Sequence, residues 1–328
     1  MKGSNYFFVV VFFFIVFSCK ENDSENEFVA PPIAVTQSPY DNPTWHPSGK
    51  IIGFNHTPIK EISYYNGQQY FWKFNRDSTG FWLIDNDGTN MRRILPYRLY
   101  TPAWSPDGKW IAFSRNAQIC IMPFDGEKFD TTATHTLTDN GRNFFPSWSP
   151  DGKWLTYDSN EDSDKGQYFI WKINTTGTIK KRIAYTPHIG EIRMPYWRQD
   201  NSILHQRYVA EKKTPDIFSM DSTGSNVIRI TDNDIFEVNI KSSAKNEYIT
   251  YVSYSGKLTL NRLDVSTNET VTLTEWCEDY SWSPDGERIV YVNFNDTYID
   301  KTMGCLWIMD KDGKNKEPLT YNNFKIMK

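Results

Sequence analysis

The sequence predicts an all-β protein, a six-bladed β-propeller with four-stranded antiparallel blades, and three observations lead to this prediction. A strand–turn–strand unit is repeated along the chain, a second strand-and-turn unit follows each copy, and the copies together use almost the whole chain. Internal repeats with a period of roughly 20–50 residues are typical of propellers and solenoids. We therefore expect one ring of similar units rather than several unrelated domains.

The first unit is a tight hairpin. Its clear copies read Trp-Ser-Pro-Asp-Gly at residues 104–108, 148–152 and 282–286, and a looser copy reads Trp-His-Pro-Ser-Gly at 45–49. Proline fixes φ at the first central position of a turn, and glycine takes the left-handed position that closes it. After the turn at 104–108, Ile111 and Phe113 fall on one face and Trp110 and Ala112 on the other, which is the period of a strand. Each copy is therefore a strand, a turn and a second strand.

The second unit is an apolar strand that ends in Asp or Asn and a glycine turn. It occurs at residues 81–88, 119–126, 170–177, 217–224 and 306–313. Two hairpins per repeat supply the four strands of one propeller blade.

The spacing of the anchor tryptophans gives the number of blades. These residues are Trp45, Trp104, Trp148, Trp197 and Trp282. The last interval is about two repeats long, and residues 239–251 and 258–264 keep the strand pattern there without the motif, so we count six blades. A closed ring also protects the sheet edges.

The irregular intervals predict insertions and leave the ring closure open. The long first interval indicates an insertion in blade one at residues 59–79, where aromatic and basic residues cluster, and blade three has a smaller polar one at 159–166. The strand-like segments 33–36 and 318–320 compete for the position that closes the ring.

The charge balance argues against a nucleic-acid partner. The chain of 328 residues has 36 basic and 40 acidic side chains and a net charge of −4. A nucleic-acid binder would show a strongly basic footprint.

The amino terminus has the pattern of an export signal. Lys2 precedes an apolar run at residues 6–17, which is short for a membrane span, and the run ends in Val-Phe-Ser-Cys at 16–19. This ending resembles a bacterial lipobox, in which a signal peptidase cuts before a cysteine that carries the lipid. The resemblance implies a signal peptide at 1–18, a lipidated Cys19, a flexible acidic tether at 19–29 and a propeller at 30–328. An uncleaved anchor and an ordinary secretory signal are the alternatives.

The expected location follows from this terminus. An acidic run after the lipidated cysteine resembles the surface-export signal of lipoproteins in the Bacteroidota, and a solvated spacer would look the same. We expect an outer-membrane lipoprotein in the envelope of a Gram-negative bacterium, either periplasmic or surface-exposed.

Three further cysteines remain. Cys120 lies in an apolar strand and is expected in the core. Cys277 and Cys305 fall in one blade and are a candidate disulfide, but the sequence does not give the distance between them.

The repeat resembles a known family. The motif Pro-Ala-Trp-Ser-Pro-Asp-Gly-Lys at 102–109, with its copies, looks like the WD-like repeat of the TolB propeller and of the propellers attached to prolyl oligopeptidases. The resemblance covers essentially residues 30–322. It implies the fold rather than the function, because propellers host binding, scaffolding and catalysis alike.

Motifs for catalysis and metal binding are not found in the sequence. It has no Gly-x-Ser-x-Gly element, and its five histidines (His46, His56, His135, His188 and His205) show no His-x-His or His-Glu-x-x-His spacing. The Asp-rich turns at 85–88 and 310–313 lack the glutamate of a calcium loop, because Ile94 and Leu319 stand at its position. We therefore predict no catalytic residue, no metal and no cofactor.

An enzyme remains the alternative. Oligogalacturonate lyases resemble this repeat and gather histidines and a metal around the axis, so a polysaccharide lyase or hydrolase is kept as a second hypothesis.

Propeller geometry gives the candidate binding residues. The inner strand of each blade begins near the axis, so the residues before each anchor are expected to surround one mouth of the channel. The candidates are Asp41, Asn42, Tyr100, Phe144, Arg193, Glu237, Glu278 and Asp279. Their mixture of aromatic faces, acids and one arginine suits a protein, a peptide or a glycan. We expect a monomeric, non-catalytic binding module with an envelope partner, and a purely structural envelope component is the third possibility.

Overall fold

The computed structural model describes residues 38–65, 69–184, 191–209, 212, 214–294 and 301–327. The expected signal peptide, Cys19, the acidic tether and the strand at 33–36 lie outside these residues. Within the described ranges, no helix combines the length and the apolar character needed to cross a membrane.

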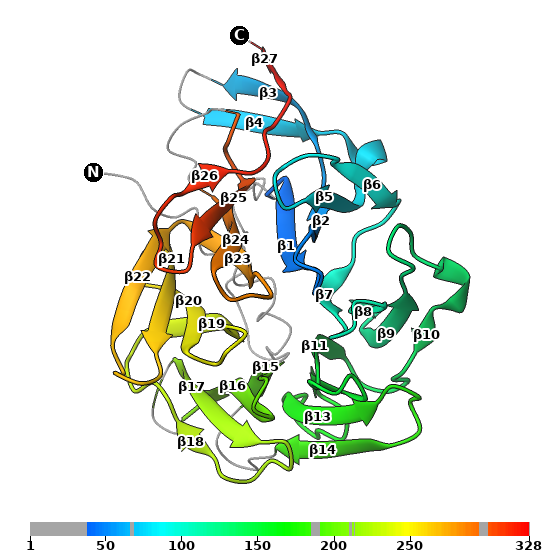
Figure 1. The fold of residues 1–328 in the computed structure, drawn as a ribbon, viewed down its shortest axis with the longest axis vertical. Coiled ribbons are helices and arrows are strands. Elements are labelled where there is room, and N and C mark those ends of the chain that lie inside the picture. The colour runs from blue at the N-terminus through cyan, green and yellow to red at the C-terminus, as the bar shows by residue number, and fades with distance from the viewer. Residues whose placement is uncertain are drawn as a thin grey trace, which may run out of the picture.

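Six four-stranded antiparallel sheets lie around a central axis as the blades of a propeller (Figure 1). In each blade the strands pair in chain order, with the first strand nearest the axis. The first three blades contain β1 (Tyr40–Trp45), β2 (Ile51–His56), β5 (Gly80–Asp85) and β6 (Arg92–Leu95); β7 (Tyr100–Trp104), β8 (Trp110–Arg115), β9 (Gln118–Pro123) and β10 (His135–Thr136); and β11 (Asn143–Trp148), β12 (Trp154–Ser159), β13 (Phe169–Asn174) and β14 (Lys180–Ala184).

The last three blades follow the same order. They contain β15 (Ile192–Trp197), β16 (Ser202–Tyr208), β17 (Pro215–Asp221) and β18 (Ile228–Arg229); β19 (Phe236–Ser242), β20 (Tyr248–Tyr254), β21 (Leu258–Asp264) and β22 (Thr270–Glu275); and β23 (Cys277–Trp282), β24 (Arg288–Asn293), β25 (Cys305–Asp310) and β26 (Glu317–Pro318). The fold class is confirmed, and the motif-free stretch at 239–264 forms a complete blade.

The repeated turns close as expected. Gly108, Gly152 and Gly286 have φ values of 70°, 68° and 76°, in the left-handed region that glycine adopts without steric cost. The aspartate of each turn accepts a hydrogen bond from the preceding serine hydroxyl, at 2.6 Å in Asp107 and Asp151. The motif therefore forms the hairpin turn between the first and second strands of a blade.

The core lies between the blades. Each of six hydrophobic clusters joins two neighbouring sheets, for example Leu83 of blade one with Ile111 of blade two, or Leu204 of blade four with Ile249 of blade five. The remaining clusters follow the same plan. Because both faces of a blade are buried, the strands are apolar on both sides.

The ring closes through contacts between blades one and six. Residues 317–318 form the outer strand of blade six, and in the described chain each blade takes its four strands from one stretch of sequence. Phe54 packs near Val290 in one cluster, and Trp45 N donates to Ser281 Oγ at 3.0 Å.

The insertion in blade one forms a separate sheet. Strands β3 (Ile59–Tyr65) and β4 (Gln69–Phe74) make a hairpin, followed by the short 3₁₀ helix η2 (Arg76–Ser78). The final strand β27 (Lys325–Met327) pairs in parallel with β3, and the three strands lie outside the ring (Figure 1). The insertion in blade three contains turns but no strand between β12 and β13.

Candidate functional site

A β-bulge near the start of each inner strand shapes the channel. The pairing of first and second strands shifts register at the same place in all six blades. In five blades the residue at the bulge has a positive φ: 50° at Asn42, 47° at Thr101, 54° at Phe145, 53° at Met194 and 53° at Asn239.

Proline follows the bulge in four blades, as Pro43, Pro102, Pro146 and Pro195. Proline lacks the N–H group that a regular ladder needs, and a bulge is where a strand tolerates it. The bulge re-aims the next side chains, and those residues form the wall of the channel.

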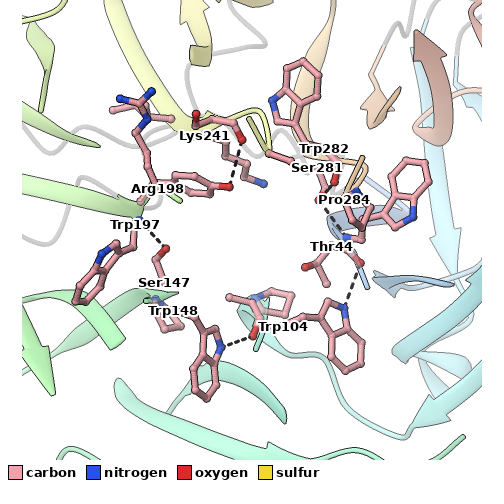
Figure 2. Close-up of a pocket in the computed structure, with 18 of the residues that line it drawn as sticks. Thr44, Trp104, Ser147, Trp148, Trp197, Arg198, Lys241, Ser281, Trp282 and Pro284 are labelled. Carbon is pink, nitrogen blue, oxygen red and sulfur yellow. Dashed lines mark hydrogen bonds between the residues drawn. The ribbon is translucent and has the colours of Figure 1, made fainter. Parts of the chain in front are cut away.

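The axis holds a cavity of about 670 Å³. Its wall contains the bulge residues, the residue before each anchor and the first residues of the turns (Figure 2). This volume lies within the range of roughly 300–1,000 Å³ that is usual for ligand pockets.

The anchor tryptophans fix the wall rather than face the cavity. Trp45, Trp104, Trp148, Trp197 and Trp282 are only 5–8% exposed. Trp104 Nε1 donates to Thr44 O at 3.3 Å, and Trp148 Nε1 donates to Ala103 O at 2.9 Å, so each indole reaches the wall of the preceding blade. Trp197 N donates to Ser147 Oγ at 2.9 Å. These contacts link the inner strands of blades one to four in sequence.

One side of the wall is polar and charged. We define the charged sector as Asn42, Asn239, Lys241 and Asp279, from blades one, five and six. Asp279 accepts from Asn42 N at 3.2 Å and from Asn239 Nδ2 at 2.9 Å.

Lys241 is the cation of the charged sector. It lies 4.9 Å from the centre of the Tyr280 ring, and its Nζ donates to Tyr280 O. Burial lowers its pKa, although Asp279 opposes this shift. In Figure 2 the Lys241 side chain points into the channel.

The opposite side is mostly apolar. We define the apolar sector as Thr101, Ala103, Phe145 and Met194, from blades two, three and four; all four line the cavity and are partly exposed. Tyr196 also lines the cavity, and its hydroxyl donates to Ser242 O of blade five at 3.3 Å. The cavity therefore presents an apolar wall and a charged wall to the same ligand.

The predicted mouth residues divide into two groups. Asn42 and Asp279 line the cavity, whereas the cavity wall does not include the other six candidates. Tyr100 is 48% exposed. Phe144 is half-buried, with its ring 6.2 Å from that of Tyr168.

Three charged candidates are buried, contrary to the expected exposure. Asp41 accepts from Asn55 Nδ2 at 2.8 Å and is paired with Arg98. Arg193 Nε donates to the fully buried Asp158 at 3.2 Å, and its guanidinium lies 4.0 Å from the centre of the Tyr168 ring. Burying these charged groups costs desolvation free energy, and pairing each one with an opposite charge offsets that cost.

Glu237 is the third, and it is placed away from the axis. Its carboxylate accepts from Thr231 Oγ1 at 2.5 Å and from Asn233 Nδ2 at 2.9 Å. The register shift of blade five falls between Val238 and Lys241, so Asn239 occupies the position that was assigned to Glu237. The missing anchor motif in this blade caused the offset of two residues.

Glu278 is half-buried at the seam between blades six and one. Burial, with Asp279 and Asp41 nearby, raises its pKa to about 8, and Arg98 opposes this shift. The binding role of the eight candidates stays a prediction.

Sequence reasoning missed the residue directly before each anchor. Thr44, Ser147, Lys241 and Ser281 line the cavity. The prolines that mark the bulge were a signal for them, because a bulge turns the residues that follow it toward the axis.

The described histidines are dispersed. His205 is fully buried and burial lowers its pKa to about 3; His56 is buried beside Tyr40; His46 Nε2 lies 3.0 Å from Gly108 O in the next blade; His135 is exposed in β10. His188 lies outside the described residues. In the part of the chain that the structure describes, no three His, Cys, Asp or Glu side chains are grouped closely enough to hold a metal ion.

The candidate disulfide is not formed. Cys120, Cys277 and Cys305 are all buried, and none of them is in a disulfide. Asn293 of β24 pairs with Cys277 on one side and with Cys305 on the other. The two cysteines are therefore two strand spacings apart, roughly 9–10 Å, which is beyond the reach of a disulfide. The expected core position of Cys120 is confirmed.

The sequence matches the TolB beta propeller domain over residues 73–328. The chain belongs to the TolB β-propeller family. A comparison with proteins of curated function gives no match.

Solved TolB structures share the fold. TolB from Acinetobacter baumannii is 23% identical with a TM-score of 0.59, and the match covers 73% of this chain and 59% of that chain. A putative TolB from Agrobacterium tumefaciens is 19% identical with a TM-score of 0.56, covering 75% and 87%. The present chain thus spans less than two thirds of the Acinetobacter protein.

An enzyme is also similar in fold. An oligogalacturonate lyase in complex with manganese is 12% identical with a TM-score of 0.54, covering 85% of this chain and 76% of that chain. At these identities the likeness shows the fold alone.

Proposed function

We propose that this TolB-family propeller is a non-catalytic binding module of the cell envelope, held to the membrane through a lipidated Cys19, and that it captures a polypeptide segment in its central channel. The observation that carries the proposal is the two-sided cavity wall. The apolar sector gives a site for an apolar side chain, and the charged sector gives Lys241 and Asp279 for polar groups of the same segment. Concave sites that join apolar walls with a few fixed polar groups are typical of ligand binding.

The burial of the anchor tryptophans favours a polypeptide ligand over a glycan. A wide, open tryptophan face is a common platform for a sugar ring. The anchor indoles are at most 8% exposed because they pack between blades. A peptide needs no such platform, since backbone groups and mixed side chains suit the polar and apolar walls.

Capture with matched lysine variants tests the proposal. The acylated protein, Lys241→Met and Lys245→Met would each be used to isolate binding proteins from envelope extracts, with quantitative mass spectrometry. Lys245 is exposed on the turn of the same blade, and its nearest acid is Glu287 at 4.0 Å. We expect one reproducible protein that binds wild type and Lys245→Met and is reduced at least about tenfold by Lys241→Met, the loss of one buried charged contact. Equal capture by all three forms would contradict a channel site.

The same eluates separate the alternatives. Glycan fragments that return shortened or unsaturated would indicate a lyase, and an eluate without any bound protein or glycan would favour a purely structural component.

A further inference from the structure

The sheet formed by β27, β3 and β4, which we call the rim sheet, has no place in the binding channel. It lies outside the ring beside blades one and six (Figure 1). Its inner face packs on a small core of its own that contains Ile59, Ile62 and Met303, with Trp72 and Phe324 partly buried against it. The rim sheet is therefore an ordered platform with one face turned away from the propeller.

The described chain enters the fold next to this platform. Ser38 Oγ donates to Gly304 O at 3.2 Å, and Thr57 N donates to Pro39 O at 2.8 Å. Gly304 follows Met303 of the rim-sheet core, and Thr57 lies two residues before the start of β3. The entry point is thus fixed at the edge of the rim sheet.

The length of chain between Cys19 and this entry point limits which face meets the membrane. Residues 19–37 number 37 − 18 = 19. A flexible chain of this length has a root-mean-square span of about 25 Å. A lipid on Cys19 would keep the entry point at an average distance of about this size from the bilayer, with the rim sheet as the adjoining structure.

The rim sheet carries the charges and side chains that suit a lipid surface. Lys60, Lys73, Arg76 and Lys325 are exposed. With Glu61 and Asp77, residues 59–65, 69–78 and 325–327 carry 4 − 2 = +2, whereas the whole chain carries −4.

Large apolar side chains are exposed beside and within β27, although Ile326 pairs with the buried Ile62 and so lies on the opposite face of the sheet from Lys325. Tyr321 is 60% exposed just before β27, and Ile326 is 51% exposed within it. Basic residues attract anionic headgroups, and amphipathic aromatic side chains favour the membrane interface.

We propose that the rim sheet rests on the lipid headgroups of the membrane that holds Cys19, so that the channel has a fixed orientation to that membrane. This inference rests on the lipid anchoring in the proposed function. It goes beyond that function because it assigns a second, lipid-facing surface that is separate from the channel.

Depth-dependent quenching tests it. The acylated full chain would carry an environment-sensitive dye on Tyr321→Cys or, as a matched control, on Ile228→Cys, and would be reconstituted in vesicles of phosphatidylethanolamine and phosphatidylglycerol with headgroup spin labels. Ile228 is 61% exposed in blade four, across the ring from the rim sheet (Figure 1). The native thiols Cys120, Cys277 and Cys305 are buried and do not compete for the dye.

We expect quenching at residue 321 to exceed that at residue 228 by about threefold or more, and Lys73→Gln with Lys325→Gln to reduce it toward the control. Glutamine removes the charges without placing a second acid beside Glu61, which lies opposite both lysines in the register of the sheet. Equal quenching at the two positions, in protein that stays on the vesicles, overturns this inference alone. Protein that does not stay on the vesicles overturns the anchoring itself, and the inference with it.

Discussion

Blades two and three keep the repeat motif, and blades four and five have lost it, yet all four hairpins close. In the regular blades, Ser149 Oγ donates to Asp151 at 2.6 Å and accepts from Trp154 N at 2.9 Å. In blade five, Ser243 Oγ accepts the matching bond from Tyr248 N at 3.1 Å without an aspartate. The turn of blade five therefore closes with the serine hydroxyl alone.

Blades four and five differ from the regular blades in the residues that replace the motif. Blade four has Arg198 where the motif has serine, and blade five has Ser242 in place of the anchor tryptophan, preceded by Lys241. Arg198 and Lys241 both line the cavity. The regular repeat builds the scaffold, and the departure in blade five brings a cation, Lys241, to the charged sector, whereas the Arg198 guanidinium is held by Asp200 and Asn246 O.

The largest expected difference in the free energy of unfolding is between the anchor positions of a regular and an irregular blade. Trp148→Ala removes an indole that is 8% exposed and packs between blades two and three, so we expect a loss of about 4 kcal/mol in the free energy of unfolding. Ser242→Ala should cost about 1 kcal/mol. Urea unfolding followed by tryptophan fluorescence and circular dichroism measures both, and similar losses would break the comparison.

The next test asks whether Arg193 of blade four belongs to the scaffold. Arg193→Met leaves Asp158 buried without its cation, and we expect a loss of about 3 kcal/mol. The double variant Arg193→Met, Asp158→Asn should recover part of that loss in the same unfolding experiment. A fully stable Arg193→Met protein would assign this residue to binding instead.

A pH titration sharpens the charge pattern at the seam of blades six and one. The folded-state pKa of Glu278 is raised to about 8, so the folded protein holds this proton more tightly than the unfolded chain. Stability should therefore fall as pH rises from about 4.5 to about 8. Because the side chain is half-buried, we expect Glu278→Gln to gain only about 1–2 kcal/mol at pH 8. The melting temperature of both forms across this range is the measurement, and parallel curves would contradict the assignment.

The turns give the smallest contrast. Asp151 accepts from Ser149 Oγ and from Lys153 N at 3.1 Å, and Asp200 of blade four accepts from Ser202 Oγ at 2.6 Å and from Ser202 N at 2.9 Å. Alanine at either position should cost about 1 kcal/mol. A loss in blade three alone would show that the turn of blade four is held by other contacts, and melting curves of the two variants decide this.

The fold could be predicted from the sequence because each turn repeats the same local chemistry. A Pro-Asp-Gly sequence fixes a hairpin without reference to the rest of the chain, and its spacing gave the blades and the insertion at 59–79. The site was harder to predict. The bulge at Asn42 or Phe145 depends on strand pairing, and it turned the wall toward residues such as Ser147 that the sequence analysis did not select. The pairing of Arg193 with Asp158 joins two blades, and no local pattern shows such a contact.

We propose that a polypeptide binds in the channel and not at the outer strands of the blades. Photo-crosslinking in growing cells tests it most directly, with a photoreactive residue in place of Met194 in the apolar sector or of Val271, which is 43% exposed on the outer strand of blade five. The account predicts one protein adduct at position 194 that is lost with Lys241→Met, and no adduct at position 271. An adduct at position 271 alone, or none at position 194, would contradict it.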